Sequence, residues 1–177
     1  MVSDESLMLE FRRGSREAFD ELFERYREPL YGFFRRRLPN GERAEDLAQE
    51  TFLAVLRGVE RYEPRALVRT YLYGIALKLL AAELRKQMRI VGPEPGSEPA
   101  REVPTDEALW VRQAVEKLDA GEREILMLRE YEQLSYAEIA ELLRLPINTA
   151  RSRLFRSRMA LKNHLAPADS EARYGSK

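Results

Sequence analysis

The chain has 177 residues and a formal net charge of zero, because 30 lysine and arginine residues balance 30 aspartate and glutamate residues. It has no cysteine, which excludes disulfides and thiolate metal sites and fits a reducing compartment. No apolar run approaches the ~20 residues that cross a bilayer, and the first residues do not resemble a signal peptide, so we expect a cytoplasmic protein without membrane insertion.

Two blocks of helical patterning are separated by a segment rich in proline and glycine. The first predicted domain covers residues 1–89 and the second covers residues 107–165. Residues 90–106 contain four prolines and two glycines and are predicted to form a flexible linker. Residues 166–177 are polar and are predicted to form a disordered tail. The abundance of Leu, Ala, Glu and Arg, together with short connections, predicts an all-α bundle in each domain.

Four helices are expected in the first domain. They are a short helix over 4–13, a long helix that begins after Ser15, a third over 44–57 and a last long helix over 67–89. Apolar residues at offsets of three and four indicate the buried faces of the second and third. These predicted core residues are Phe19, Leu22, Phe23, Tyr26, Leu30, Phe33, Leu47, Phe52 and Val55.

The last helix of this domain carries a stripe of aromatic and cationic side chains. Tyr71, Lys78 and Arg85 recur at offsets of seven and therefore share one face. Further cations and an aromatic residue lie in and near the preceding loop: Arg61, Tyr62, Arg65 and Arg69. Rings that stack on bases and cations that follow phosphates are what a single-stranded nucleic-acid groove requires. The alternative is that the rings belong to the core and the cations are solvated.

The third helix presents a polar side that contains Asp46, Gln49 and Glu50. Asp46 and Glu50 are like charges four residues apart, which is mildly destabilising in an isolated helix. This arrangement hints at a partner surface, although an ordinary solvated face would look the same.

The second domain begins with apolar residues at heptad-like spacing: Ala108, Val111, Val115 and Leu118. A second helix is expected to start at Asp119. Ser135 and Glu138 then form an S-x-x-E capping box, which indicates the start of a third helix. Pro146 ends that helix, because proline disfavours helical geometry in the residue before it.

A fourth helix is expected to restart after Pro146, with Asn148 or Thr149 as its N-cap. The result is a helix-turn-helix whose second helix buries Ala150, Leu154 and Leu161. From Arg144 to Lys162 there are six cationic residues and no acid. A solvated helix usually mixes charge signs, so this pattern favours a surface that binds nucleic acid. Arginine can hydrogen-bond guanine bidentately in the major groove, and Phe155 could contact a thymine methyl. A basic, solvated face is the alternative.

No catalytic constellation is recognisable. The single histidine, His164, lies near the end of the last helix, where a cation complements the helix dipole. The glycine- and proline-rich stretch over 92–96 lacks the lysine and the strand context of a phosphate-binding loop. We therefore expect no enzymatic activity, no cofactor and no metal.

These elements together resemble an extracytoplasmic-function (ECF) sigma factor of the sigma-70 family, over roughly residues 5 to 165. AFDELFERYREPLYGFFRRR resembles the start of region 2, and AEDLAQETFLAVL resembles the segment that docks on core RNA polymerase. LVRTYLYGIALKLLAAELRK resembles the part that melts and reads the −10 element. LSYAEIAELLRLPINTARSRLFRSRMALK resembles region 4, whose major-groove helix reads the −35 element.

The resemblance implies three groups of contact residues. Those for core polymerase are Asp46, Gln49 and Glu50. Those for single-stranded −10 DNA are Arg61, Tyr62, Arg65, Arg69, Tyr71, Lys78 and Arg85. Those for −35 duplex are Asn148, Thr149, Arg151, Ser152, Phe155, Arg156, Arg158 and Lys162. The −10 helix departs from the family pattern, which usually has tryptophan at the position of Tyr71, asparagine at Lys78 and often aspartate at Ala82.

The expected partners are core RNA polymerase, promoter DNA and an anti-sigma factor. Two other functions are compatible with parts of the sequence. A stand-alone helix-turn-helix regulator would use only the second domain to bind DNA, usually at a palindromic site. A pure interaction protein would bind polymerase but no promoter, and the basic face of the last helix argues against it.

Overall fold

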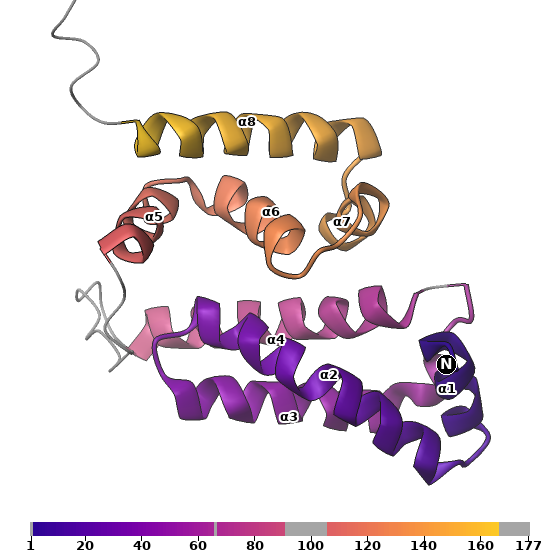
Figure 1. Cartoon of the computed structure of the whole chain (residues 1–177). Coiled ribbons are helices and arrows are strands. Elements are labelled where there is room, and N and C mark those ends of the chain that lie inside the picture. The colour runs from indigo at the N-terminus through magenta and orange to yellow at the C-terminus, as the bar shows by residue number, and fades with distance from the viewer. Residues whose placement is uncertain (1, 66, 91–105, 167–177) are drawn as a thin grey trace, which may run out of the picture. The chain divides into compact units, whose positions relative to one another are not determined.

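The computed structural model describes residues 2–65, 67–90 and 106–166, and the chain divides into two compact units, residues 1–100 and 101–177. Across those described ranges the regular structure is helical throughout, with no strand (Figure 1). The predicted all-α fold with two helical domains is confirmed. The predicted flexible linker and disordered tail lie, but for their end residues Ile90, Asp106 and Ala166, outside the described residues.

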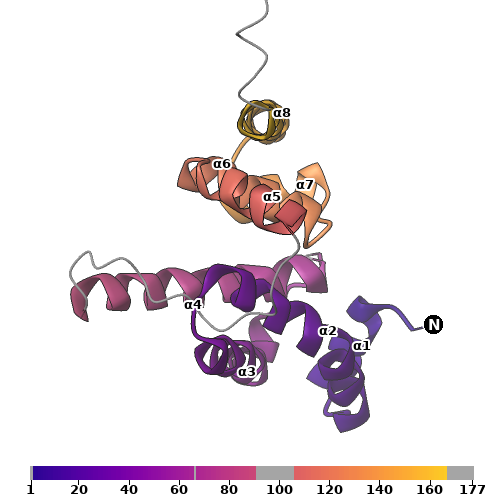
Figure 2. The same cartoon turned by 60° about the vertical axis from the view of Figure 1, so that its left-hand side comes forward.

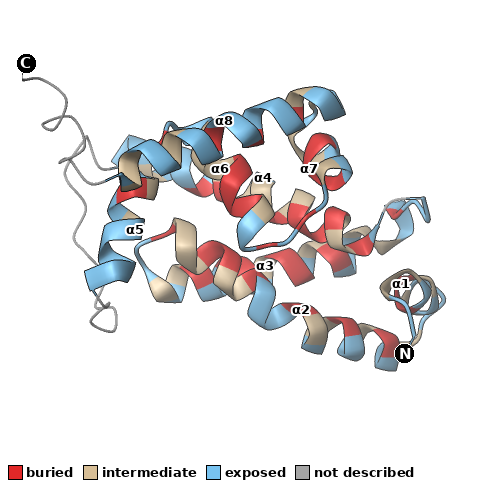
Figure 3. Cartoon of the chain, turned by 45° about the horizontal axis from the view of Figure 1, so that its top comes forward, coloured by how far each residue is buried: buried red, intermediate tan, exposed pale blue. Residues whose placement is uncertain are grey.

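The first unit is a helical bundle in which α2 packs against the other three α-helices. Its elements are α1 (Asp4–Arg12), α2 (Arg16–Arg37), α3 (Gly41–Gly58), the 3-10 helix η1 (Val59–Arg61) and α4 (Val68–Ile90). α2 packs against α1, α3 and α4, and α4 also packs against α3, as the turned view shows (Figure 2). The core is apolar and aromatic: its fully buried side chains include Met8, Leu30, Phe33, Phe34, Leu47 and Val55. Buried residues follow the inner faces of these helices (Figure 3).

Side-chain caps set the starts of the helices in this unit. Ser15 accepts a hydrogen bond from the amide of Ala18, as expected for the cap of α2. α3 begins at Gly41, three residues before the predicted start, because Asn40 accepts from the amide of Arg43 and caps the helix. Asparagine in the turn therefore also begins the next helix. Of the predicted core residues, Phe19 and Phe23 are only half-buried, and the rest are buried.

The second unit places three short helices beneath a long one. They are α5 (Asp106–Glu116), α6 (Ala120–Glu130), α7 (Tyr136–Leu143) and α8 (Ile147–Leu165), and α8 packs against the other three (Figure 1). Ala150 and Leu154 on α8 are buried, whereas Leu161 is only half-buried. The heptad-like pattern over 108–118 was a poorer guide, because Val111 is 40 % exposed and Ala114 is the buried residue of α5.

The turn between α7 and α8 has defined geometry. The predicted capping box is confirmed, since Ser135 accepts from the amide of Glu138 and Glu138 accepts from the amide of Ser135. Arg144 ends α7 in the left-handed region, with φ 53°. The predicted N-cap of α8 is wrong. Pro146 is the capping residue, and it makes no side-chain cap because its ring has no acceptor. Its carbonyl accepts from the amides of Thr149 and Ala150, so the helix begins at Ile147.

Within the described part of the chain, no helix is both long and apolar enough to cross a membrane.

Candidate nucleic-acid and partner interfaces

The outward face of α8 is cationic and partly apolar. Ser152, Phe155 and Arg156 are exposed, and the Phe155 side chain is 65 % exposed although it is a large apolar residue. α8 contains five lysine or arginine residues and no acid. A helix that keeps an aromatic ring in solvent among arginines has a surface suited to base edges and phosphates.

One flank of α8 is held by the neighbouring helices. The guanidinium of Arg151 lies 5.7 Å from the ring centroid of Tyr136, and that of Arg129 lies 5.1 Å from the same ring. Arg151 also approaches the amide oxygen of Asn148 at 3.5 Å. Tyr136 is the first residue of α7, so the helix-turn-helix itself positions these two arginines. Cation–π contacts of this kind orient a guanidinium without neutralising its charge.

Arg158 is placed differently from Arg151. Its Nε and Nη2 both donate to Oε1 of Glu130, at 3.2 and 2.7 Å, and this ion pair joins α8 to the last residue of α6. The remaining predicted residues of this surface are exposed or half-buried: Asn148, Thr149 and Lys162. All eight predicted residues are therefore at least partly exposed, but Arg158 already has an acidic partner.

In the first unit, the loop before α4 places two tyrosines together. The rings of Tyr62 and Tyr71 meet edge to face, with centroids 5.3 Å apart. Tyr62 is only 2 % exposed, and its burial, followed by the charge of Glu5, raises its pKa to about 12. Tyr71 is half-buried, and burial raises its pKa as well. Tyr62 is a predicted −10 contact, and in the free chain its ring is buried against the ring of Tyr71.

The cations predicted for this surface are at least partly exposed. Arg61, Arg65, Lys78 and Arg85 are exposed, and Arg69 is half-buried. The carboxylate of Glu5 accepts a hydrogen bond from the amide of Val68 at 3.2 Å, which satisfies an unpaired donor at the start of α4. A residue of α1 thus fixes the start of the helix that carries Tyr71 and Lys78. Sequence reasoning missed this contact, because 63 residues separate its partners.

The polar side of α3 is organised by an arginine that sequence reasoning also missed. Asp46 and Gln49 are exposed and Glu50 is half-buried, as expected for one helical side. Arg43 reaches Glu50 at 3.0 Å, Asp46 at 3.6 Å and Glu83 of α4 at 2.8 Å. The Arg43 hydrogen bonds lower the pKa of the Glu83 carboxyl, whose side chain is only 8 % exposed. Three carboxylates around one guanidinium leave this patch with net negative charge.

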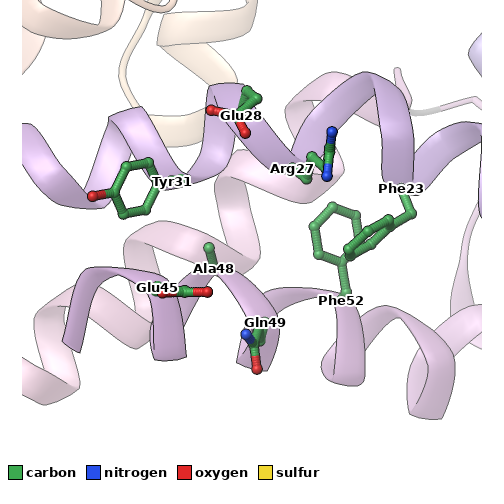
Figure 4. A pocket seen from close by; sticks show the side chains of 8 residues that line it. All are labelled: Phe23, Arg27, Glu28, Tyr31, Glu45, Ala48, Gln49 and Phe52. Carbon is green, nitrogen blue, oxygen red and sulfur yellow. The ribbon is translucent and has the colours of Figure 1, made fainter. Parts of the chain in front are cut away.

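An open groove lies beside Gln49, between α2 and α3, with a volume of about 310 Å³ (Figure 4). α2 contributes Phe23, Arg27, Glu28 and Tyr31, and α3 contributes Glu45, Ala48, Gln49 and Phe52. The rings of Phe23 and Phe52 pack together at one end, with centroids 4.7 Å apart. Leu53 and Leu56 continue the exposed side of α3 with apolar residues, 45 % and 43 % exposed. The combination of acids, a groove with aromatic and charged lining, and exposed leucines is typical of a surface that binds another protein.

Two sigma-70 family models match the chain. The model of Sigma-70 region 2 matches residues 22–90, and the model of Sigma-70, region 4 matches residues 108–161. The RNA polymerase sigma factor CarQ of Myxococcus xanthus is 33% identical over 171 residues, which cover 93% of this chain and 98% of CarQ. The RNA polymerase sigma-H factor of Pseudomonas aeruginosa is 30% identical over 187 residues, with 96% and 97% covered. The ECF RNA polymerase sigma factor SigW of Bacillus subtilis is 27% identical over 173 residues, with 87% and 92% covered.

Solved structures show the same fold. CnrH, in complex with the cytosolic domain of CnrY, matches with a TM-score of 0.73 and 25% identity, over 92% of this chain and 96% of CnrH. The sigma factor RpoE of Bartonella quintana, in complex with the anti-sigma factor NepR, matches with a TM-score of 0.67 and 24% identity, over 83% and 96% of the two chains.

These matches run through both helical units and not through the helix-turn-helix alone, so a stand-alone regulator is not favoured. The chain belongs to the sigma-70 family, and it is a promoter-directing sigma factor of the extracytoplasmic-function type.

Proposed function

We propose that the chain binds core RNA polymerase with residues 1–89, reads −35 duplex with residues 107–165, and reads melted −10 DNA with the loop and helix that carry Tyr71. The single observation that carries this proposal is the outward face of α8, where Phe155 and the arginines are exposed in a helix without acids. The polymerase supplies the chemistry of phosphodiester synthesis, and this chain supplies positioning without catalysis.

At the −35 element, α8 lies in the major groove. Arg156, Ser152 and Phe155 point outward and contact base edges, whereas Arg151 and Arg158 lie on the flank toward α6 and α7 and contact phosphates. In this division of labour, phosphate contacts set the register and base contacts set the sequence. Each good bidentate pair between arginine and guanine contributes ~1–3 kcal/mol of discrimination.

At the −10 element, Tyr71 stacks on an unpaired base while Lys78 and Arg85 follow the backbone. The support for this is the spacing of the three along one face of α4 and the exposure of both cations. Stacking on an aromatic ring contributes ~1–3 kcal/mol per base and so helps to offset strand separation. Tyr62 holds the Tyr71 ring in place by edge-to-face contact and does not itself touch DNA.

The polymerase surface consists of Asp46, Gln49 and Glu50, extended by Leu53 and Leu56. The acids suit a basic partner surface, and the exposed leucines supply apolar area at its centre. We also propose an anti-sigma factor as a regulatory partner, because NepR fulfils that role for RpoE. The cytosolic domain that CnrY contributes to its complex supports a cytoplasmic location for this chain too.

Run-off transcription tests the proposal directly. Purified core polymerase is supplied with a promoter library from the source genome, with or without the full chain. We expect transcripts that depend on the chain and share two spaced elements, which would also reveal both promoter sequences. Binding of palindromic duplex by the chain alone, with no transcript, would instead support the stand-alone regulator.

Variants locate the −35 surface. Phe155→Ala and Arg156→Ala should lower transcription from every selected promoter, and bases that were required at −35 should become tolerated. Arg153→Ala is the control for charge, because Arg153 is also an exposed arginine of α8 and lies about 160° around the helix axis from Phe155 and about 60° from Arg156. Equal losses for Arg153→Ala and Arg156→Ala would show that only total charge matters.

Lys78→Ala tests the −10 surface. It should slow open-complex formation and reduce its dependence on salt concentration, since one phosphate contact is lost. Unchanged rates at every salt concentration would remove Lys78 from the surface.

A further inference from the structure

Arg158, one of the cations that we propose contact DNA, forms an ion pair with Glu130. Nε and Nη2 of Arg158 both donate to the same oxygen of Glu130. This ion pair, at 2.7 Å, joins an arginine of α8 to an acid of α6. Glu130 therefore binds an arginine that lies on the same face of α8 as Arg151, seven residues earlier, and Phe155, three residues earlier.

Glu130 is poorly placed for the stability of its own helix. It is the last residue of α6, where the negative end of the helix dipole disfavours an acid. Its side chain is 51 % exposed, and that of Arg158 is 45 % exposed. An exposed pair of this kind contributes little to folding and can exchange partners readily. What the pair does change is the charge that α8 offers to a phosphate backbone.

We propose that Glu130 withholds Arg158 from phosphates, and so weakens sequence-independent binding to DNA. The inference rests on the proposed role of α8 at the −35 element. On any duplex, Arg158 must leave Glu130 before it can bind a phosphate, and the freed carboxylate then repels the backbone. On a promoter, the base contacts of Arg156 and Phe155 add to the binding energy and compensate for that exchange.

This arrangement separates affinity from discrimination. Phosphate contacts strengthen binding to all sequences alike, whereas base contacts strengthen binding to one. An acid that suppresses one phosphate contact therefore lowers the affinity for random DNA and leaves the difference between sequences to the base contacts. The net charge of zero in the whole chain is consistent with such restraint.

The test is Glu130→Gln in the full-length chain. Binding of a short random-sequence duplex is followed by fluorescence anisotropy over a range of salt concentrations. One additional phosphate contact should steepen the slope of log K against log salt by about 0.9, and raise affinity about fivefold near 0.15 M salt. Holoenzyme that carries the variant should bind the selected promoter and random DNA more tightly by a similar factor, because the added phosphate contact does not depend on sequence.

Glu116→Gln is the matched control, because Glu116 is an exposed acid in the same unit and pairs at 3.0 Å with Arg112 of its own helix, not with a cation of α8. If both variants bind random DNA equally well, the effect is one of net charge and the proposal is wrong. Weaker binding by Glu130→Gln would also overturn it, since Glu130 would then be orienting Arg158 toward DNA.

A second variant tests the route of the effect. Adding Arg158→Ala to Glu130→Gln should abolish the gain, and a gain that persists would rule Arg158 out. Failure here is distinct from failure of the proposed function. If Arg156→Ala abolishes promoter selection while Glu130→Gln changes nothing, only the inference about Glu130 fails. If Arg156→Ala leaves promoter selection intact, the assignment of α8 fails first.

Discussion

The pair between Arg43 and Glu83 gives a sharp prediction about the first unit. Arg43 lies at the start of α3, and Glu83 lies about four turns into α4. The guanidinium donates to Glu83 Oε2 through both Nε and Nη2, at 3.0 and 2.8 Å. Gln87 supplies a further hydrogen bond to Oε1, at 3.0 Å. Arg43→Gln would remove both guanidinium hydrogen bonds from an almost buried carboxylate and leave it the hydrogen bond from Gln87 and the nearby charge of Lys86.

The expected cost follows from burial. Removing one partner of a fully buried ion pair costs roughly 3–5 kcal/mol, because the remaining charge is left uncompensated. The Glu83 side chain is 8 % exposed, but that of Arg43 is 28 % exposed, so water can partly replace the guanidinium. We therefore expect Arg43→Gln to lower the free energy of unfolding by about 2–3 kcal/mol. For a domain of this size, such a loss lowers Tm by roughly 10–20 °C.

The double variant Arg43→Gln with Glu83→Gln should recover most of that loss. It removes the buried charge and leaves two amides that can hydrogen-bond, so it should lie within about 1 kcal/mol of the native chain. Arg57→Gln is the control on the same helix, because Arg57 is exposed and its loss should change stability by less than about 0.5 kcal/mol.

Differential scanning calorimetry of the full chain, with tryptophan fluorescence in parallel, is the assay. Trp110, in α5, is the single tryptophan, so its fluorescence follows the second unit and should not change. The calorimetric transition of the first unit should shift. A loss below about 0.5 kcal/mol for Arg43→Gln, or an equal loss in the double variant, would refute the reasoning.

The pH dependence of the same pair has a definite sign. The Arg43 hydrogen bonds lower the pKa of Glu83 in the folded chain, so the pair stabilises above the unfolded pKa of about 4.3, and this stability is lost as pH falls through the lower folded pKa. In Arg43→Gln, burial without the guanidinium favours the protonated carboxyl. The difference in stability between the variant and the native chain should therefore shrink as pH falls from 7 toward 5.

Three further predictions concern single contacts. Glu5→Ala should cost about 1 kcal/mol through the lost cap of α4, and hydrogen exchange should show a faster-exchanging Val68 amide. Ser135→Ala removes half of the capping box and should cost about 1 kcal/mol, measured as a lower Tm of the Trp110 transition. Leu154→Ala leaves a cavity beneath α8 and should cost about 3 kcal/mol in the same assay, since Leu154 is 1 % exposed; a change below 1 kcal/mol would show that α8 is not held by this core.

The helices could be predicted from the sequence because their signals are local. Periodic apolar residues and side-chain caps lie within a few positions of one another, as at Ser135 and Glu138. The failures occurred where a local pattern has two meanings. Asn148 and Thr149 are good capping residues, yet α8 begins at Ile147 with Pro146 as its N-cap. Val111 fits an apolar heptad, but α5 presents Ala114 to the neighbouring helices instead.

The candidate sites were only partly predictable, for a different reason. Stripes along one helix, such as Tyr71 with Lys78, follow from the spacing alone. Contacts between helices do not, and these decide which side chains are available. Arg158 and Glu130 are 28 residues apart in the sequence, and Arg43 and Glu83 are 40 apart. Tyr62 has an aromatic ring that could stack on a base, and only the structure shows that this ring is buried.

Charge is segregated in this chain although its sum is zero. α8 carries five lysine or arginine residues and no acid, whereas α3 carries four acids and two arginines. Bulk electrostatics therefore gives the whole chain little attraction for DNA, and each surface acts at short range. Two short-range DNA surfaces bind weakly when separate, but fixing both on one polymerase makes the second contact intramolecular. The chain should consequently select promoters only as part of the holoenzyme. The polymerase, which we propose binds the acidic side of α3, would hold both DNA surfaces at the high effective concentration that a neutral chain cannot reach by charge alone.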